Sequence, residues 1–533
     1  MTGNATGFVA RRSPVITRHC VVSSSSPPVT EVGLRVLRDG GNAVDATVAM
    51  AGMTAVAEPM MSGLGGDTMI LFWSAKNRKV FGLNGSGPAP SGVALDPTAT
   101  MMPTTGAASV TIPGAVDGWC RLLERFGTRP LTQLWEPAIR AAREGYPVGE
   151  SIAGFWALAA PALPHYASAD LQQILLPGGH PPRPGQLMRF PRLADTLELV
   201  ADGGRDAFYT GPVAEAIAAT LTAGGVPTTL DEVGAHESQW VEPLSVDYRG
   251  HQVLGLPPNS QSIVALIALG LLEGFDLAAM PQPQRVHHQI EAVRLGFEFA
   301  ITKVGDPASV DTEAVREALS DSGLRALRAR ITDSASAPVH CDGGNTSDTT
   351  YLCAIDADGN AVSLMMSICG VFGSGLLAGD TGVILNNRAS QFSTVPGHPN
   401  VLAPGRRPRH TILPGMVLRD GAPEYVLGCI GLNNHPQGQM QALVNALDLG
   451  MNPQQAVDAP RFRVVMTTGE VQLDPGLPAE VGHQLTARGH RMGNPYDFKG
   501  AAQMVRIHRG GDGVGPCLEA GVDSRLDGAA LGW

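Results

Sequence analysis

The first part of the chain alternates apolar, helix-like segments with glycine-rich turns. Residues 30–38 place apolar side chains at helical spacing and end at a Gly-Gly pair, which predicts a helix. Residues 42–59 are rich in alanine and almost wholly apolar, which predicts a second, buried helix. The turn "SGLGGD" (62–67) follows, and the apolar run "TMILFWS" (68–74) predicts a strand. The pattern therefore indicates a packed core from the start of the chain.

Helical patterns continue through the middle of the chain. They dominate residues 113–225, where successive apolar segments each end in glycine. A strand over 251–258 leads into an apolar helix over 262–275, and residues 284–302 again have a helical pattern. Residues 332–346 are rich in Ser, Gly and Asp and are the best candidate for a linker. The chain is thus helix-rich before this linker.

Strand patterns dominate the chain after the linker. The apolar runs 349–356 and 360–368 flank "ADG" (357–359), and an Asp-Gly between two such runs is a strong hairpin signal. The other elements expected here are strands over 382–387, 424–431 and 470–474 and a helix over 437–450. The last third of the chain is therefore strand-rich, in contrast with the first part.

Composition and charge exclude several classes of protein. The chain has 533 residues, of which 44% are hydrophobic and 16% charged, and its net charge is −11. This profile is typical of a globular protein and does not favour nucleic acid as a partner. No stretch approaches roughly 18 apolar residues, so we expect no membrane span. The N-terminus lacks the apolar core of a signal peptide and no Cys-x-x-Cys pair occurs, so we expect a reduced, cytoplasmic protein.

Metals and cofactors are not expected from the motifs in the chain. The sequence has no His-Glu-x-x-His motif and no clustered His/Asp set that would indicate a metal site. The run "GSGLLAG" (373–379) lacks the βαβ context of a nucleotide-binding loop. The pair His287-His288 is interpreted as packing or surface. Asp67, which ends the turn "SGLGGD", is interpreted as a turn cap, with the lining of a pocket as the alternative.

The linker delivers Thr349 to the first position of a predicted strand. One interpretation is structural, because β-branched threonine suits a strand. The other is an N-terminal nucleophile, which is formed when the chain is cut just before a threonine and the new α-amine acts as its base. An unperturbed α-amine has a pKa near about 8, which suits this role. Backbone N–H groups for an oxyanion could come from the glycine-rich turn "GCIGLNN" (428–434). The residues alone leave both interpretations open.

Distinctive sequence blocks occur in order along nearly the whole chain: "LRDGGNAVDATVA", "SGLGGD", "VTIPGAVDGW", "DYRGHQVLGLPP", "SDTTYLCAIDADGNAVS", "FGSGLLAGDTGVILNN" and "DSRLDGAALGW". Together they resemble the γ-glutamyltransferase family of N-terminal nucleophile hydrolases. The resemblance implies an α/β fold, a four-layer αββα sandwich, made as a precursor that cuts itself. It also implies a helix-rich large subunit, 1–348, and a strand-rich small subunit, 349–533, that carries the nucleophile and pairs with the large one.

The resemblance assigns the catalytic positions residue by residue. The nucleophile of the family falls on Thr349, so cleavage is expected after Asp348. The second threonine of the family, which contacts the nucleophile, falls on Ser367, and this change keeps the hydroxyl. The Gly-Gly pair that supplies the oxyanion N–H groups falls on Gly431 and Leu432. A leucine still offers a backbone N–H.

The implied substrate-binding positions depart from those of the glutamyl-transferring members. An arginine that grips the substrate carboxylate is replaced by Asn84, and an acidic residue for the substrate ammonium by Gln391. The first change removes a bidentate fork and the second removes a charge. Arg388 replaces a neutral glutamine and is a candidate for holding a small carboxylate. The remaining positions of this set are Cys369, where asparagine is usual, and the pair His410-Thr411, where two serines are usual.

These departures resemble the oxamate amidohydrolases and acylase-like members, and a related set that hydrolyses a carbon–carbon bond and releases an oxalyl group in pathways to antibiotics with alkylated proline units. The function expected is hydrolysis of a small, carboxylate-bearing acyl substrate through an acyl-enzyme. Three alternatives stay open: cleavage of a carbon–carbon bond, true γ-glutamyl hydrolysis or transfer, and an uncleaved, non-catalytic homologue.

Overall fold

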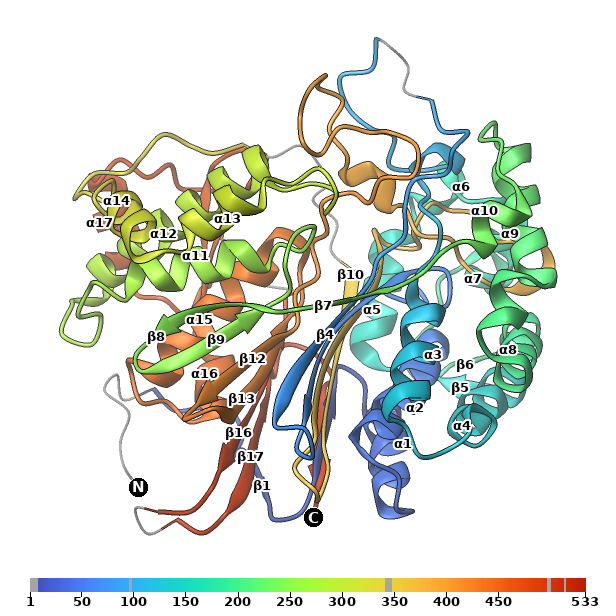
Figure 1. The fold of residues 1–533 in the computed structure, drawn as a ribbon, viewed down its shortest axis with the longest axis horizontal. Helices are drawn as coiled ribbons and strands as arrows, with labels where there is room; N and C mark the ends of the chain where they lie inside the picture. Colours follow the sequence, from blue (N-terminus) through green and yellow to red (C-terminus); the bar gives the residue numbers. More distant parts are fainter. Residues whose placement is uncertain (1–7, 95–97, 341–347, 496–499, 512–513) are drawn as a thin grey trace.

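Two antiparallel β-sheets face each other at the centre of the molecule, and helices cover the outer face of each (Figure 1). The computed structural model describes residues 8–94, 98–340, 348–495, 500–511 and 514–533. The second part of the expected linker, 341–346, lies outside these residues. The layer order is helix, sheet, sheet, helix, so the expected α/β class and four-layer αββα sandwich are confirmed.

The first sheet has seven strands, and every neighbouring pair in it is antiparallel. In spatial order the strands are β18 (Ala529–Gly532), β2 (Val21–Ser24), β10 (Asp348–Ile355), β11 (Ala361–Cys369), β3 (Asp67–Ser74), β4 (Lys79–Gly85) and β7 (Gln239–Val241).

The second sheet also has seven strands, again with antiparallel neighbours. Their order is β1 (Val15–Thr17), β17 (Cys517–Val522), β16 (Ala502–His508), β13 (Ala422–Cys429), β12 (Gly415–Arg419), β9 (His251–Gly255) and β8 (Leu244–Tyr248). Two small ribbons add β5 (Tyr146–Pro147) with β6 (Leu187–Met188), and β14 (Phe462–Val464) with β15 (Val471–Leu473).

The helices form two outer layers. The layer over the first sheet contains α1 (Pro27–Arg38), α2 (Ala43–Ala57), α3 (Ala115–Phe126), α4 (Leu131–Glu144), α5 (Glu150–Ala159), α6 (Leu163–Tyr166), α7 (Ala169–Leu175), α8 (Pro191–Tyr209), α9 (Pro212–Ala223) and α10 (Leu230–Gly234). The other contains α11 (Ser262–Leu272), α12 (Gln282–Lys303), α13 (Thr312–Ala318), α14 (Asp321–Arg328), α15 (His435–Leu447), α16 (Pro453–Asp458) and α17 (Ala479–Ala487). None of the helices in the described residues is long and apolar enough to cross a lipid bilayer.

Three hydrophobic cores fill the three spaces between the layers, and strand periodicity explains how one strand serves two of them. On β10, Leu352 and Ala354 pack in the core beneath α1–α9, whereas Tyr351, Cys353 and Ile355 pack between the two sheets. Successive side chains of a strand point to opposite faces, so a strand buried on both faces is apolar throughout. This explains the unbroken apolar run that follows Thr349.

Several elements expected from the sequence are confirmed. The hairpin is formed by β10 and β11, and Gly359 in its turn has a positive φ of 82°. The alanine-rich helix is α2, and every one of its residues is buried. Beyond the hairpin, β13 and β15 and helix α15 lie within or overlap the remaining expected ranges.

The strand expected over 382–387 is wrong. This segment belongs to neither sheet. Gly382 is left-handed, with a φ of 71°, and within the segment only Ile384 makes an isolated bridge, to Leu377. Its backbone bonds go to loops instead: the N–H of Asn386 donates to the carbonyl of Gly65, and that of Asn387 to the carbonyl of Ile368. The segment is apolar because it is buried beneath the turn "SGLGGD".

Both sheets combine strands from before and after residue 348. The first sheet takes β2, β3, β4 and β7 from the earlier part and β10, β11 and β18 from the later part. The earlier part is helix-rich, as expected, but it also supplies β1, β8 and β9 to the second sheet. The two parts are therefore interleaved and share all three cores.

Candidate active site

Thr349 lies near the start of β10, at an irregularity in its pairing with β11. Asp348 is opposite Cys369, but Thr350 is opposite Met366, so Thr349 faces two residues of β11 rather than one. The extra residue is on β11. Such a β-bulge bends its strand locally and changes the direction of the side chains there. The Thr349 side chain is fully buried. The bulge thus places Thr349 against the segment that contains Ser367.

Ser367 joins the bulge to the neighbouring strand. It pairs with Asp67 in the register between β11 and β3, and its Oγ accepts a hydrogen bond of 2.8 Å from the Cys369 N–H. Cys369 has a positive φ of 79°, which is uncommon for a residue with a side chain, and it ends β11. Strain of this kind clusters at functional sites. Thr349, Ser367 and Cys369 therefore lie close together where β10 and β11 pair.

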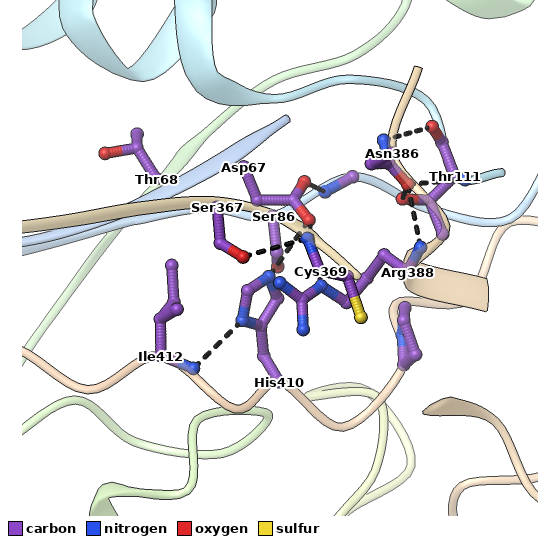
Figure 2. Close-up of polar contacts among 12 residues, drawn as sticks. Asp67, Thr68, Ser86, Thr111, Ser367, Cys369, Asn386, Arg388, His410 and Ile412 are labelled. Carbon is purple, nitrogen blue, oxygen red and sulfur yellow. Dashed lines mark hydrogen bonds and ion pairs between the residues drawn. The ribbon is translucent and has the colours of Figure 1, made fainter. Parts of the chain in front are cut away.

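Asp67 organises the other half of the site, although the sequence favoured a turn cap for it over the lining of a pocket. Its carboxylate accepts hydrogen bonds from Arg388 Nε at 3.3 Å, His410 Nε2 at 3.0 Å and the Gly87 N–H at 3.1 Å (Figure 2). Asp67, Arg388 and His410 are all fully buried. The interpretation of Asp67 as a turn cap is wrong: it is the shared acceptor of a buried ion-pair cluster.

The charges in this cluster are fixed by burial and by close contacts. Burial alone would raise the pKa of Asp67, but the hydrogen bond from His410 and the charge of Arg388 outweigh it and hold that pKa below its usual value. Burial and the charge of Arg388 lower the pKa of His410 to about 4, although Asp67 opposes this shift. At neutral pH the cluster thus contains one anion, one cation and a neutral histidine whose Nε2 carries the proton.

Arg388 lies in a short 3-10 helix, η4 (Arg388–Gln391), and the structure pairs only part of its guanidinium. Nε donates to Asp67 and Nη1 donates to Thr411 Oγ1 at 2.9 Å. Nη2 is buried and has no hydrogen-bond partner among the described residues. A buried donor left unpaired is costly, so it indicates a place for an acceptor from outside the chain.

The other two expected substrate-binding side chains differ in their surroundings. Asn84 is buried and already paired: its Oδ1 accepts from the N–H and Oγ of Ser86, and its Nδ2 donates to Asn259 Oδ1 at 2.8 Å. Gln391 is also buried, at the end of η4, and its backbone carbonyl accepts from Asn400 Nδ2. Asn84 therefore organises the loop beside the cluster.

The turn after β13 lies next to this cluster. Gly431 has a φ of 129°, which only glycine adopts without strain, and Leu432 begins the 3-10 helix η5 (Leu432–Asn434). The Asn434 N–H donates to the carbonyl of Gly431 at 2.9 Å and closes the turn. The next residue, His435, donates from Nδ1 to the carbonyl of Thr411 at 2.8 Å. The turn and the Arg388 cluster thus share Thr411.

His435 is a second residue that sequence reasoning missed. It is fully buried, and burial lowers the pKa of His435 to about 3, with the charge of Arg388 acting in the same direction. Its Nε2 has no partner among the described residues. The available signal was a histidine directly after a glycine-rich turn that itself follows a strand.

A separate group of ionisable side chains joins α12 to His490, which lies after α17. One ligand atom each from His287, Glu291 and His490 falls within 4.8 Å of the others, a spatial grouping that no sequence motif indicated. Arg294 Nη1, however, donates to His490 Nδ1 at 3.3 Å, which leaves the proton on His490 Nε2. That nitrogen donates to His287 Nδ1 at 2.7 Å, so the two nitrogens are joined by a hydrogen bond. The group is a buried network that joins α12 to His490, and the buried pair His287-His288 is packing, the first of its two interpretations.

Comparison with known proteins identifies the family. The sequence profile of the gamma-glutamyltranspeptidase family matches residues 29–533. The chain is 34% identical to the glutathione hydrolase-like YwrD proenzyme of Bacillus subtilis, with 98% of this chain and 99% of that protein aligned. It is 31% identical to the oxamate amidohydrolase proenzyme of Klebsiella pneumoniae, with 97% and 99% aligned. The crystal structure of a cephalosporin acylase from Bacillus halodurans superposes with a TM-score of 0.91 at 35% identity, covering 99% of this chain and 98% of that one. The chain therefore belongs to the gamma-glutamyltranspeptidase family of N-terminal nucleophile hydrolases.

Proposed function

We propose that this chain is an autoprocessing threonine hydrolase that cleaves a small acyl substrate bearing a carboxylate. The processing site is the bond between Asp348 and Thr349, and the products are the subunits 1–348 and 349–533. The two relatives described above are named as proenzymes, which supports processing. The interleaved sheets support it too, because a cut chain whose parts share three cores stays assembled.

The nucleophile is Thr349. In processing, its Oγ attacks the carbonyl of Asp348, and water hydrolyses the resulting ester to leave a free α-amine. In turnover, that amine takes the proton of the hydroxyl as Oγ attacks the substrate carbonyl, and then protonates the leaving amine. Water releases the acid from the acyl-enzyme. The N–H groups of Gly431 and Leu432 stabilise the oxyanion in both reactions.

One observation carries the assignment of the substrate: the unpartnered Nη2 of Arg388. The side chain is fully buried, and its other contacts to Asp67 and Thr411 fix the direction of the guanidinium. A substrate carboxylate would satisfy this donor with a charge-assisted hydrogen bond. Because Asp67 already balances part of the charge of Arg388, the site suits one small anionic group rather than several.

The same region disfavours a γ-glutamyl substrate. Such a substrate carries an ammonium as well as a carboxylate, and an ammonium needs an acidic partner. Gln391 is neutral, and Asp67 is already engaged by Arg388, His410 and Gly87. These contacts support hydrolysis of a small acyl group over glutamyl transfer.

The substrate class is tested by comparing two compounds with the purified protein. Oxamate carries a carboxylate beside an amide, and γ-glutamyl-p-nitroanilide carries an α-amino acid group. We expect ammonia release from oxamate and almost no release of nitroaniline. The Arg388→Gln variant is expected to raise KM for oxamate by about tenfold or more, since a hydrogen bond to a charged group is lost. Rapid cleavage of the anilide with no reaction of oxamate would overturn the assignment.

A further inference from the structure

The hydrogen bonds of His435 determine which of its ring nitrogens carries the proton. Nδ1 lies 2.8 Å from the carbonyl oxygen of Thr411, which can only accept, so Nδ1 is the N–H donor. The ring is neutral, because its burial lowers the pKa of His435 to about 3. Nε2 is therefore an acceptor, and this acceptor is buried without a partner among the described residues.

Thr411 also contacts a buried side chain that offers a hydrogen-bond donor, Arg388. Arg388 contacts the hydroxyl of Thr411 through Nη1, and its Nη2 is also buried without a described partner. Thr411 thus connects one unpaired donor and one unpaired acceptor, both on fully buried side chains. Each unpaired atom carries a desolvation cost that a ligand would remove. A ligand that satisfies both must present an acceptor and a donor.

The neighbouring unpaired atoms are less informative. Asn434 Oδ1 is also buried without a described partner. An asparagine amide, however, can rotate by half a turn and exchange its acceptor for a donor. The Thr411 carbonyl prevents this exchange in His435, because rotating the ring would lose the hydrogen bond to it. His435 is therefore the side chain that defines the polarity of a ligand at this point.

We propose that His435 is a specificity-determining residue that selects substrates with an N–H group beside the carboxylate-bearing acyl unit. This inference rests on the proposed function, in which Arg388 holds the carboxylate. His435 Nε2 accepts the hydrogen bond from the amide N–H while Arg388 Nη2 donates to the carboxylate. An ester, which lacks this N–H, leaves Nε2 unpaired. The site is thus built to prefer amides over esters of the same acid, and sites of this kind discriminate strongly against analogues that lack the donor.

The test uses two substrates of nearly equal size, N-methyloxamate and monomethyl oxalate. The first is an amide with an N–H where the second, an ester, has an oxygen. Both release oxalate, so one assay gives kcat/KM for each. The informative variant is His435→Asn, whose side-chain amide can still donate to Thr411 but does not extend to the position of Nε2. We expect kcat/KM for N-methyloxamate to fall by about tenfold or more, with little change for monomethyl oxalate.

The His435→Gln variant is the conservative control, because its longer side chain can place an oxygen near the position of Nε2. It is expected to recover part of the loss for N-methyloxamate. An equal loss for both substrates in His435→Asn, or no loss for either, would overturn the inference. Arg388→Gln should weaken both substrates alike. Failure of the wild-type protein to hydrolyse either compound would instead overturn the proposed function, and with it this inference.

Discussion

At the residue scale, Asp67 shows how a single buried carboxylate fixes two functional side chains. It is the acceptor for both Arg388 and His410, and the three side chains are shielded from water. A buried ion pair gains little net stability over an apolar pair, but removing one partner leaves a charge without compensation. The value of Asp67 is therefore in positioning, since it directs the guanidinium so that Nη2 remains available.

The variant Asp67→Asn tests this role. We expect it to destabilise the fold by about 3 kcal/mol, because Arg388 loses its charged partner in a buried site. Activity is expected to fall more than the loss of folded protein explains. Chemical denaturation and kcat/KM measure the two effects. The matched control is Asp247→Asn on β8, where the side chain is exposed. Equal behaviour of the two variants would contradict the positioning role.

The contacts of Asp67 with Arg388 and His410 could not be predicted from the sequence. Asp67 lies 321 residues from Arg388 and 343 from His410 in the chain, so no local pattern connects them. The linker before Thr349 and the strand after it made a nucleophile one of two interpretations, and the family resemblance then favoured it. A cluster assembled from four distant loops and strands becomes visible only in the fold.

At the element scale, the end of helix α2 supports the start of β10. Glu58, the C-cap of α2, accepts a hydrogen bond of 2.5 Å from the hydroxyl of Thr350, the neighbour of the proposed nucleophile Thr349. Ser62 Oγ donates to the same Thr350 hydroxyl at 2.9 Å. Burial raises the pKa of Glu58 to about 7, against the hydrogen bonds from Thr350 and Ser25. Glu58 is therefore protonated in the folded protein over much of the acidic range.

The pKa of Glu58 predicts a pH dependence of stability. The folded value lies above the ordinary one of 4.5, so the folded state keeps a proton that the unfolded state loses. The stabilisation is present below about pH 4.5 and is lost as pH rises through about 7, by about 3 kcal/mol in total. Glu58→Gln cannot titrate. The difference in unfolding free energy between wild type and Glu58→Gln should therefore change by this amount between pH 4.5 and 7, and a constant difference would contradict the assignment.

A second prediction concerns Gly431, in the turn after β13. A Cβ added at Gly431 would lie 3.1 Å from the Cβ of Asn434, at a φ that suits only glycine. Gly431→Ala should distort the oxyanion turn and lower kcat by about a hundredfold, the cost of losing one oxyanion donor. Gly450→Ala is the control, because Gly450 also has a positive φ but has open space around it. Loss of kcat in both variants would indicate a general defect in folding instead.

The sequence predicted the hairpin over 349–368 correctly but wrongly predicted a strand over 382–387. The hairpin over 349–368 follows from its Asp-Gly turn and the apolar runs on either side. The segment 382–387 has a similar apolar pattern but joins no sheet, because its N–H groups bond to distant loops. An apolar run indicates burial, and only the partners of its backbone decide between a strand and a buried loop.

At the scale of the whole molecule, the interleaving of the two segments has a mechanical consequence. Segments 1–348 and 349–533 alternate within both sheets, so neither has a complete sheet without the other. We expect the processed protein to elute as one species in gel filtration and to unfold in one cooperative transition. Separation of the two fragments in native buffer, without denaturant, would contradict this expectation.

The four-layer architecture was predictable only through the resemblance of the whole chain to a family. Periodicity identified many strands and helices, but it did not indicate which strands are neighbours. The order β2-β10-β11-β3 joins strands far apart in sequence, and long-range pairing of this kind leaves no trace in a local window. The three cores explain why apolar residues are spread so evenly along the chain.

The central claim is that Thr349 cuts its own chain and then serves as the nucleophile. Intact-mass measurement and N-terminal sequencing of purified protein test it most directly. We expect two fragments from the wild-type chain, the smaller beginning at Thr349, and a single chain of 533 residues from Thr349→Ala. A wild-type protein that remains one chain, or a Thr349→Ala variant cut at the same bond, would show that Thr349 does not cut the chain.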